Sequence, residues 1–172
     1  MNLTPAPNGW MRQDDPGEVG PDGNRQQKRW SINAVEAKLV SELCRDLRVL
    51  EIGTGLGVST KEIAKLAKFV YTVDIDEWVE KVIAPTLPNN VIFFNNTHDI
   101  EYIKVEAAFI DGLHTYEQCC KDIDFAKSVV KPDGLLIFHD LYISGVHSAI
   151  CEKLPDFVEI KTYAGIGIAW NG

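Results

Sequence analysis

Glycines at alternate positions, directly after a short apolar run, are the first residues whose types and spacing could do chemistry. Residues 49–52 are mostly branched and apolar, as in a buried strand, and Gly53, Gly55 and Gly57 follow at once. Glycine adopts positive φ without penalty, and because it lacks a Cβ a ligand can lie against its main chain. A nucleotide-like ligand is therefore expected over the start of the helix that follows.

The spacing of the glycines and a nearby acid narrow the kind of ligand. The pattern differs from the Gly-x-Gly-x-x-Gly of dinucleotide sites, and Glu51 would repel phosphates but attract an ammonium or sulfonium group. A second strand, expected over residues 69–73, ends in Asp74, which lies 17 residues after Gly57. An acid about 20 residues past the glycines is the usual ribose ligand. An ordinary α/β connection without a ligand is the alternative for a glycine turn alone.

These two segments together resemble motifs I and II of class I S-adenosylmethionine-dependent methyltransferases. The matching residues are acid-x-Gly-x-Gly-x-Gly at 51–57 and Val-Asp-Ile-Asp at 73–76. The resemblance implies S-adenosylmethionine as cofactor, with Thr97 and His98 where related enzymes carry a Gly-Asp pair that reads the adenine; an exposed loop histidine is the alternative for His98. The cofactor-binding residues so implied are Glu51, Gly53, Thr54, Gly55, Gly57, Ser59, Asp74, Ile75, Thr97, His98 and Asp111.

A second group of polar residues follows two later apolar runs. Asp111 and His114 follow residues 107–110, and His139 and Asp140 follow the run 135–138. Because ligands of an open α/β sheet bind beyond the carboxyl ends of its strands, this group should face the methyl donor. Asp-Gly-x-His-x-Tyr and Phe-His-Asp resemble methyltransferase family 24, which includes macrolide and sugar O-methyltransferases and cephalosporin-hydroxylase-like proteins.

This resemblance implies a catalytic role for Asp111 and His114, with the histidine as base, and a divalent cation held by Asp111, His139 and Asp140. His139 stands where the family carries an acid. Magnesium prefers oxygen ligands, so an imidazole suits manganese, iron or zinc better. The alternatives are that Asp111 caps the next helix and that His139 is packed under a loop.

The expected function is methyl transfer to a hydroxyl of a small molecule. Displacement at a sulfonium is in line, so positioning supplies most of the rate and a histidine removes the hydroxyl proton. Two alternatives stay open: another enzyme on the same fold, such as an aminopropyl transferase or a hydroxylase-like relative, and a catalytically silent S-adenosylmethionine-binding protein. The sequence names neither the acceptor nor the oligomeric state.

Alternating strand and helix patterns predict an α/β, Rossmann-like, doubly wound sheet. The resemblance implies seven strands in the order 3-2-1-4-5-7-6 with an antiparallel last strand. Helix starts are expected at pairs with capping-box spacing, which are Asn33 and Glu36, Ser59 and Glu62, and Thr115 and Gln118. The expected strands are 49–52, 69–73, 91–94, 107–110, 135–138, 157–163 and 166–170.

The first 30 residues differ in composition from the rest of the chain. They hold four of the eight prolines and show almost no apolar periodicity. We expect residues 1–30 to be a flexible N-terminal segment or a lid over the active site, with Trp10, Met11 and Trp30 as anchors. Residues 31–172 then form one methyltransferase domain, since 172 residues suit a single core.

Composition argues against several classes of partner. The formal net charge is −8 and no long basic run occurs, which disfavours nucleic acid. No apolar run is long enough for a membrane span and no secretory leader is seen, so a cytoplasmic location is expected. The four cysteines lack Cys-x-x-Cys spacing and are expected to be reduced core residues.

Overall fold

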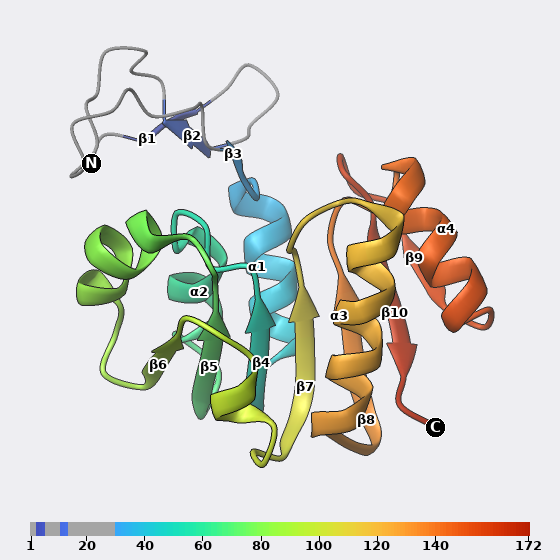
Figure 1. Cartoon of the computed structure of the whole chain (residues 1–172). Helices are drawn as coiled ribbons and strands as arrows, with labels where there is room; N and C mark the ends of the chain where they lie inside the picture. The colour runs from blue at the N-terminus through green and yellow to red at the C-terminus, as the bar shows by residue number, and fades with distance from the viewer. Residues whose placement is uncertain (1–2, 6–10, 14–29) are drawn as a thin grey trace.

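A seven-stranded sheet with helices on both faces forms the body of the protein (Figure 1). The computed structural model describes residues 3–5, 11–13 and 30–172. The strands lie in the order β6-β5-β4-β7-β8-β10-β9, with β10 antiparallel to both neighbours, which confirms the predicted order and the predicted antiparallel strand. The strands are β4 (Arg48–Ile52), β5 (Phe69–Val73), β6 (Val91–Phe94), β7 (Val105–Ile110), β8 (Val130–Phe138), β9 (Val158–Ile160) and β10 (Ile166–Trp170).

The main helices pack in pairs, one pair on each face of the sheet (Figure 1). One face carries α1 (Ala34–Leu43) and α2 (Val58–Ile63), and the other carries α3 (Tyr116–Val129) and α4 (Ser144–Lys153). Short helical turns between strands complete the chain: η1 (Val79–Ile83), η2 (Ala84–Thr86) and η3 (His98–Ile100).

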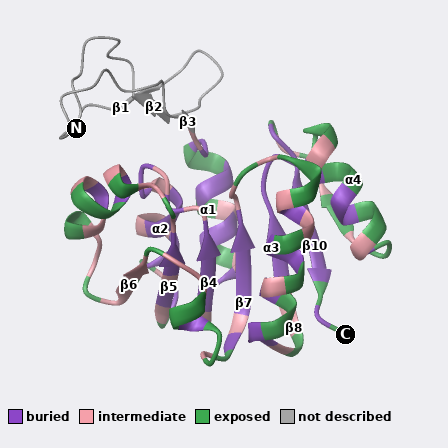
Figure 2. Cartoon of the chain, in the orientation of Figure 1, coloured by how far each residue is buried: buried purple, intermediate pink, exposed green. Residues whose placement is uncertain are grey.

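The residues of β4 and β7 are almost all buried (Figure 2). Side chains of the central strands alternate between two apolar layers. In β7, Phe109 packs in the layer under α1 and α2, whereas Ile110 packs in the layer under α3 and α4. In β8, Ile137 lies in the first layer and Phe138 in the second. Because successive side chains of a strand point to opposite faces, His139 emerges on the α1 side.

Two of the three predicted helix caps are confirmed. Asn33 caps α1 by accepting hydrogen bonds from two backbone N–H groups, and Thr115 caps α3 by accepting one from Gln118. The prediction for Ser59 is wrong. The residue before α2 is Gly57 with φ 70°, because the glycine turn runs directly into the helix and leaves the Ser59 side chain within its first turn.

Other element bounds also differ from the prediction. The strand β9 covers only three residues of the expected 157–163. Cys44 and Cys119 are buried as predicted, but Cys151 is exposed, so the assignment of all four cysteines to the core is wrong.

The N-terminal region, expected to be a flexible segment or a lid, contains a small antiparallel sheet. Its strands are β1 (Leu3–Pro5), β2 (Met11–Gln13) and β3 (Trp30–Ser31). In Figure 1 these strands lie beyond the carboxyl ends of the central strands. Trp10 falls outside the described residues, and the lid role stays a prediction. Among residues 3–5, 11–13 and 30–172, no helix is long and apolar enough to cross a membrane.

Candidate active site

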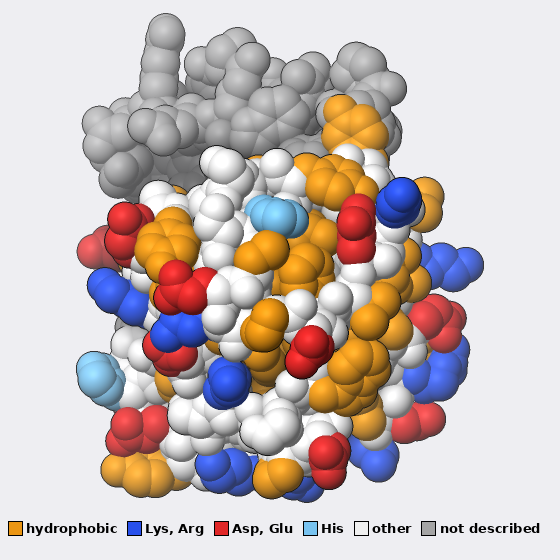
Figure 3. Space-filling model, turned by 90° about the vertical axis from the view of Figure 1, so that its right-hand side faces the viewer, with side chains coloured by type: hydrophobic (Ala, Val, Ile, Leu, Met, Phe, Trp, Pro, Cys, Tyr) orange, Lys and Arg blue, Asp and Glu red, His pale blue; other side chains and the backbone are white. Residues whose placement is uncertain are grey.

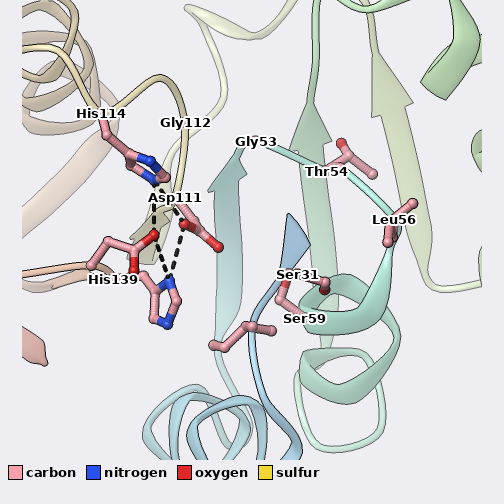
Figure 4. Close-up of a pocket in the computed structure, with 12 residues that line it drawn as sticks. Ser31, Gly53, Thr54, Leu56, Ser59, Asp111, Gly112, His114 and His139 are labelled. Atoms are coloured by element: carbon pink, nitrogen blue, oxygen red, sulfur yellow. Dashed lines mark hydrogen bonds and ion pairs between the residues drawn. The ribbon is translucent and has the colours of Figure 1, made fainter. Parts of the chain in front are cut away.

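A cavity of about 200 Å³ opens at the carboxyl ends of β4, β7 and β8 (Figure 4). It joins the glycine turn after β4 to the polar residues after β7 and β8, the two groups that the sequence predicts at this edge of the sheet. The lining residues are Ser31, Ile32, Gly53, Thr54, Gly55, Leu56, Ser59, Asp111, Gly112, His114, His139 and Asp140.

The glycine turn adopts the positive φ angles that its composition predicts. Gly53, Gly55 and Gly57 have φ angles of 96°, 51° and 70°. A Cβ on Gly55 would meet no atom within 4 Å, so this glycine is needed for its φ and leaves open main chain toward the cavity. Gly53 is different, since a Cβ there would lie 2.2 Å from the carbonyl oxygen of Asp111. Close packing of two loops therefore requires this glycine.

Glu51 lies beneath the glycine turn, fully buried, and is not among the residues that line the cavity. Its carboxylate accepts hydrogen bonds of 2.6 Å from the hydroxyls of Ser59, Thr60 and Thr72. Burial raises the pKa of Glu51 to about 7, although the three hydroxyls act in the opposite direction. In this structure Glu51 ties β4 to β5 and α2, and direct contact with a ligand stays a prediction.

Asp74 braces the glycine turn from the end of β5. Its carboxylate accepts the N–H of Gly55 at 2.9 Å and the N–H of Asp76 at 3.0 Å. It lies half-buried beside the turn and outside the cavity lining. The other predicted cofactor residues that do not line this cavity are Gly57, Ile75, Thr97 and His98, of which Ile75 and His98 are exposed.

Four polar side chains meet on the other wall of the cavity (Figure 4). His114 Nε2 lies 3.4 Å from Asp111 Oδ1 and 3.1 Å from Asp140 Oδ2. His139 Nδ1 lies 3.2 Å and 3.4 Å from the same two oxygens. Asp140 has φ 54°, a left-handed conformation that aspartate tolerates better than most residues. The two carboxylates thus lie between two imidazoles.

The charges in this cluster shift one another's pKa values. The hydrogen bond to Asp111 raises the pKa of His114 above its usual value. Burial alone would lower the pKa of His139, but the surrounding carboxylates outweigh it and raise that pKa to about 12. The pKa of Asp111 is lowered: burial acts to raise it, and the two histidines prevail. The cluster is therefore an arrangement of mutually stabilised opposite charges.

Glu36 is a member of this cluster that sequence reasoning missed. It was expected only as the partner of Asn33 at a helix start, a role it also fills. Its Oε2 lies 3.2 Å from His139 Nε2, and its Oε1 accepts the N–H of Ala164 at 2.8 Å. The capping-box pattern accounts for a glutamate at this position, so no local signal pointed to a second role.

The described residues fit a cation. Asp111, His139 and Asp140 each offer one ligand atom, and these atoms lie within 4.8 Å of one another. One nitrogen and two carboxylate oxygens suit manganese, iron or zinc better than magnesium. The alternative that Asp111 caps α3 is excluded because Thr115 fills that position. His139 is indeed packed, with 2% of its surface exposed, yet one edge reaches the cavity.

Comparison with known protein families identifies the family to which this chain belongs. The model of methyltransferase family 24, described as "Methyltransferase domain", matches residues 50–141. The chain belongs to methyltransferase family 24. The match starts within β4 and ends just after Asp140, so it spans both walls of the cavity.

One curated relative in the comparison comes from Methanococcus vannielii. It is named "Probable cobalt-precorrin-6B C(15)-methyltransferase (decarboxylating)" and is 33% identical over 99 residues. The match covers 54% of each protein, so our chain spans about half the length of this relative.

Several solved structures share the fold of this chain at low sequence identity. The O-methyltransferase TomG from Streptomyces achromogenes, solved with S-adenosylmethionine, has a TM-score of 0.68 at 16% identity, with 81% of each chain covered. The tRNA (m1A58) methyltransferase TrmI from Aquifex aeolicus has a TM-score of 0.61 at 18% identity, covering 81% of this chain and 69% of the other. Likeness at this level establishes the Rossmann-like methyltransferase fold.

Proposed function

We propose that this chain is a cytoplasmic S-adenosylmethionine-dependent O-methyltransferase that acts on a small hydroxylated molecule. The observation that carries the proposal is one cavity that joins the glycine turn to the cluster of Asp111, His114 and Asp140. Membership of methyltransferase family 24 supports the same cofactor and reaction type. The cofactor would lie over the turn, and the acceptor hydroxyl would lie on the cluster side.

Residues of the turn provide the cofactor wall. Thr54, Gly55 and Ser59 line the cavity, and a Cβ on Gly55 would meet no atom, so main chain there is open to a ligand. Asp74 accepts the Gly55 N–H with one carboxylate oxygen and the Asp76 N–H with the other, so its side chain is fixed beside the turn, where we assign it to the ribose. Glu51 would act from below by its charge and by fixing the turn.

His114 is the residue proposed to take the acceptor proton. Its side chain is 37% exposed, so an acceptor can reach it, and its Nε2 is directed at Asp111 and Asp140. The imidazole is thereby oriented, and Nδ1 is the nitrogen we assign to the hydroxyl proton. The carboxylates stabilise the imidazolium that forms, while the methyl group moves in line from the sulfonium to the oxygen.

A divalent cation is part of the proposal because the donor set fits one. Asp111, His139 and Asp140 would hold it, with manganese, iron or zinc favoured over magnesium by the imidazole. When bound, such a cation lowers the pKa of a hydroxyl that contacts it.

Small molecules are favoured over nucleic acids as acceptors by charge. The formal net charge is −8, and on the α4 side of the molecule basic side chains lie among acidic and apolar ones (Figure 3). A second acceptor class follows from the relative in Methanococcus vannielii, whose name describes carbon methylation of a cobalt-precorrin. Corrinoid precursors therefore belong in the substrate panel beside sugars, phenols and macrolides.

Calorimetry with S-adenosylmethionine, S-adenosylhomocysteine, decarboxylated S-adenosylmethionine and NAD tests the cofactor. Transfer of labelled methyl groups to the panel, with tRNA included, tests the acceptor. We expect S-adenosylmethionine to bind and a small hydroxylated acceptor to be labelled. Preference for decarboxylated S-adenosylmethionine would favour an aminopropyl transferase, and cofactor binding with no labelled acceptor would favour a silent binding protein.

A further inference from the structure

We propose that Glu36 is a positioning residue for the cation site: it holds His139 as the Nε2–H form, so that Nδ1 is the atom presented to the oxygens of Asp111 and Asp140. This inference rests on the cation in the proposed function. It concerns the first turn of α1, which lies outside the matched segment 50–141 and does not line the cavity.

The two nitrogens of His139 face different carboxylates. Nε2 lies 3.2 Å from Glu36 Oε2, on the side of α1, while Nδ1 lies 3.2 Å from Asp111 Oδ1 and 3.4 Å from Asp140 Oδ2. Glu36 is 1% exposed and His139 is 2% exposed. Buried polar groups need partners within the protein, and Glu36 Oε2 is a partner that the structure gives to Nε2.

The hydrogen bonds around Glu36 decide which nitrogen carries a proton. Oε1 accepts the backbone N–H of Ala164, a donor that cannot reverse. Oε2 accepts from Asn33 Nδ2, and the amide of Asn33 cannot flip because its Oδ1 accepts the N–H groups of Val35 and Glu36. A carboxylate in this setting is an acceptor only. Its contact with His139 Nε2 is therefore a hydrogen bond donated by Nε2.

A proton held on Nε2 leaves Nδ1 as the nitrogen of His139 that can bind a cation. Without a cation the surrounding carboxylates keep His139 protonated, and because Nε2 is held by Glu36, Nδ1 is the nitrogen that would give up its proton to a cation; it is also the atom that converges with the oxygens of Asp111 and Asp140. A carboxylate that accepts the remote N–H of a metal-binding histidine fixes the ring and raises its basicity. Glu36 would do this for His139 without touching substrate or cofactor.

Replacement of Glu36 by glutamine gives the sharpest test. However the amide is turned, its NH₂ group meets a donor, either the N–H of Ala164 or the pair Asn33 Nδ2 and His139 Nε2. In calorimetric titrations of the full-length chain with Mn²⁺, Glu36→Gln should weaken binding about 10–100-fold, the usual cost of losing such a partner. Affinity for S-adenosylmethionine, whose wall lies across the cavity, should stay unchanged.

The matched control is Asn33→Ser. Serine can still cap α1, but it removes the Nδ2 donor to Glu36 and leaves the Glu36–His139 contact in place. Mn²⁺ affinity should match that of the unaltered protein. A purely structural role for Glu36 predicts instead that both variants lose Mn²⁺ and S-adenosylmethionine affinity together. In a His139→Ala background, Glu36→Gln should have no further effect on Mn²⁺ affinity.

Imidazole nitrogen NMR of the ¹⁵N-histidine-labelled protein with Zn²⁺ avoids dependence on the folding of any variant. For His139, Nε2 should carry the proton and Nδ1 should show the shift of a coordinated nitrogen. Coordination through Nε2, equal Mn²⁺ affinity in Glu36→Gln, or no Mn²⁺ binding by the unaltered protein would each overturn the proposal. Failure to bind S-adenosylmethionine, with the Mn²⁺ results as expected, would overturn the proposed function alone.

Discussion

A Cβ placed on Gly53 would lie 2.2 Å from the carbonyl oxygen of Asp111, so the turn after β4 and the loop after β7 are in direct backbone contact. This contact sets the separation of the two walls of the cavity. Asp111 N–H also donates to the carbonyl of Ile52 at 2.9 Å, which fixes the same approach one residue earlier. The cofactor side and the acid–base side are therefore held together by main chain.

Gly53→Ala should destabilise the fold more than Gly55→Ala. At Gly53 the new Cβ would clash with the Asp111 backbone, and alanine would have to adopt a φ of 96°. At Gly55 a Cβ meets nothing within 4 Å. Strained φ alone costs about 1–3 kcal/mol, and the clash adds to this at Gly53 only. Denaturant unfolding of both variants measures the difference. Equal losses of stability would show that the approach of Gly53 to Asp111 is not tightly set.

Asp74→Ala should weaken S-adenosylmethionine binding by roughly 1.5–3 kcal/mol, the scale of a hydrogen bond to a charged group. Part of the loss would come from the Gly55 N–H that Asp74 now accepts. Calorimetry measures the affinity. Glu77→Gln is the matched control, because Glu77 is a nearby exposed acid paired with Lys81, and it should bind the cofactor normally. Unchanged affinity in Asp74→Ala would remove Asp74 from the ribose assignment.

His114→Ala should lower turnover by about 10²–10⁴-fold while leaving cofactor affinity nearly intact, as expected for a positioned base. The exposed His147, which contacts Cys151 on α4, provides the control, and His147→Ala should keep full turnover. The measurement is methyl transfer to an acceptor found in the panel. Full activity in His114→Ala would show that another group, or solvent, takes the proton.

Glu51 should make stability fall as pH rises through mildly acidic values. Its folded-state pKa is about 7 against an ordinary 4.5, so the folded protein holds the proton more tightly than the unfolded chain. The penalty for ionising the buried group is absent below about pH 4.5 and complete above about pH 7, where it reaches ~3 kcal/mol.

Glu51→Gln tests this effect, because an amide keeps oxygen and nitrogen among the three hydroxyls and does not ionise. The difference in unfolding free energy between this variant and the unaltered protein should shift in favour of the variant between pH 4.5 and 7. Comparing the two proteins at each pH removes the contribution of other carboxylates, such as Glu106, whose pKa of about 2 places its titration at lower pH. A difference that is constant across the window would contradict a raised pKa.

The amino-acid sequence by itself determined the edge of the sheet at which the site lies, while the strand order followed from the resemblance to class I methyltransferases. Alternation of apolar runs and helix patterns predicts parallel strands, and parallel strands bring their carboxyl ends to one edge. That is why Gly55, Asp111, His114 and Asp140, far apart in the chain, could be expected to line one cavity, as they do. Local signals such as the caps at Asn33 and Thr115 were equally readable.

Only the tertiary structure decided what each polar residue touches. Ser59 has the spacing of a helix cap but donates to Glu51, and Glu36 has the spacing of a cap partner but also binds His139 and the N–H of Ala164, 128 residues away. Sequence spacing reports neighbours within a turn or a strand. Contacts between elements depend on how the packed layers bring side chains together, and burial then requires each polar atom to find whichever partner lies there.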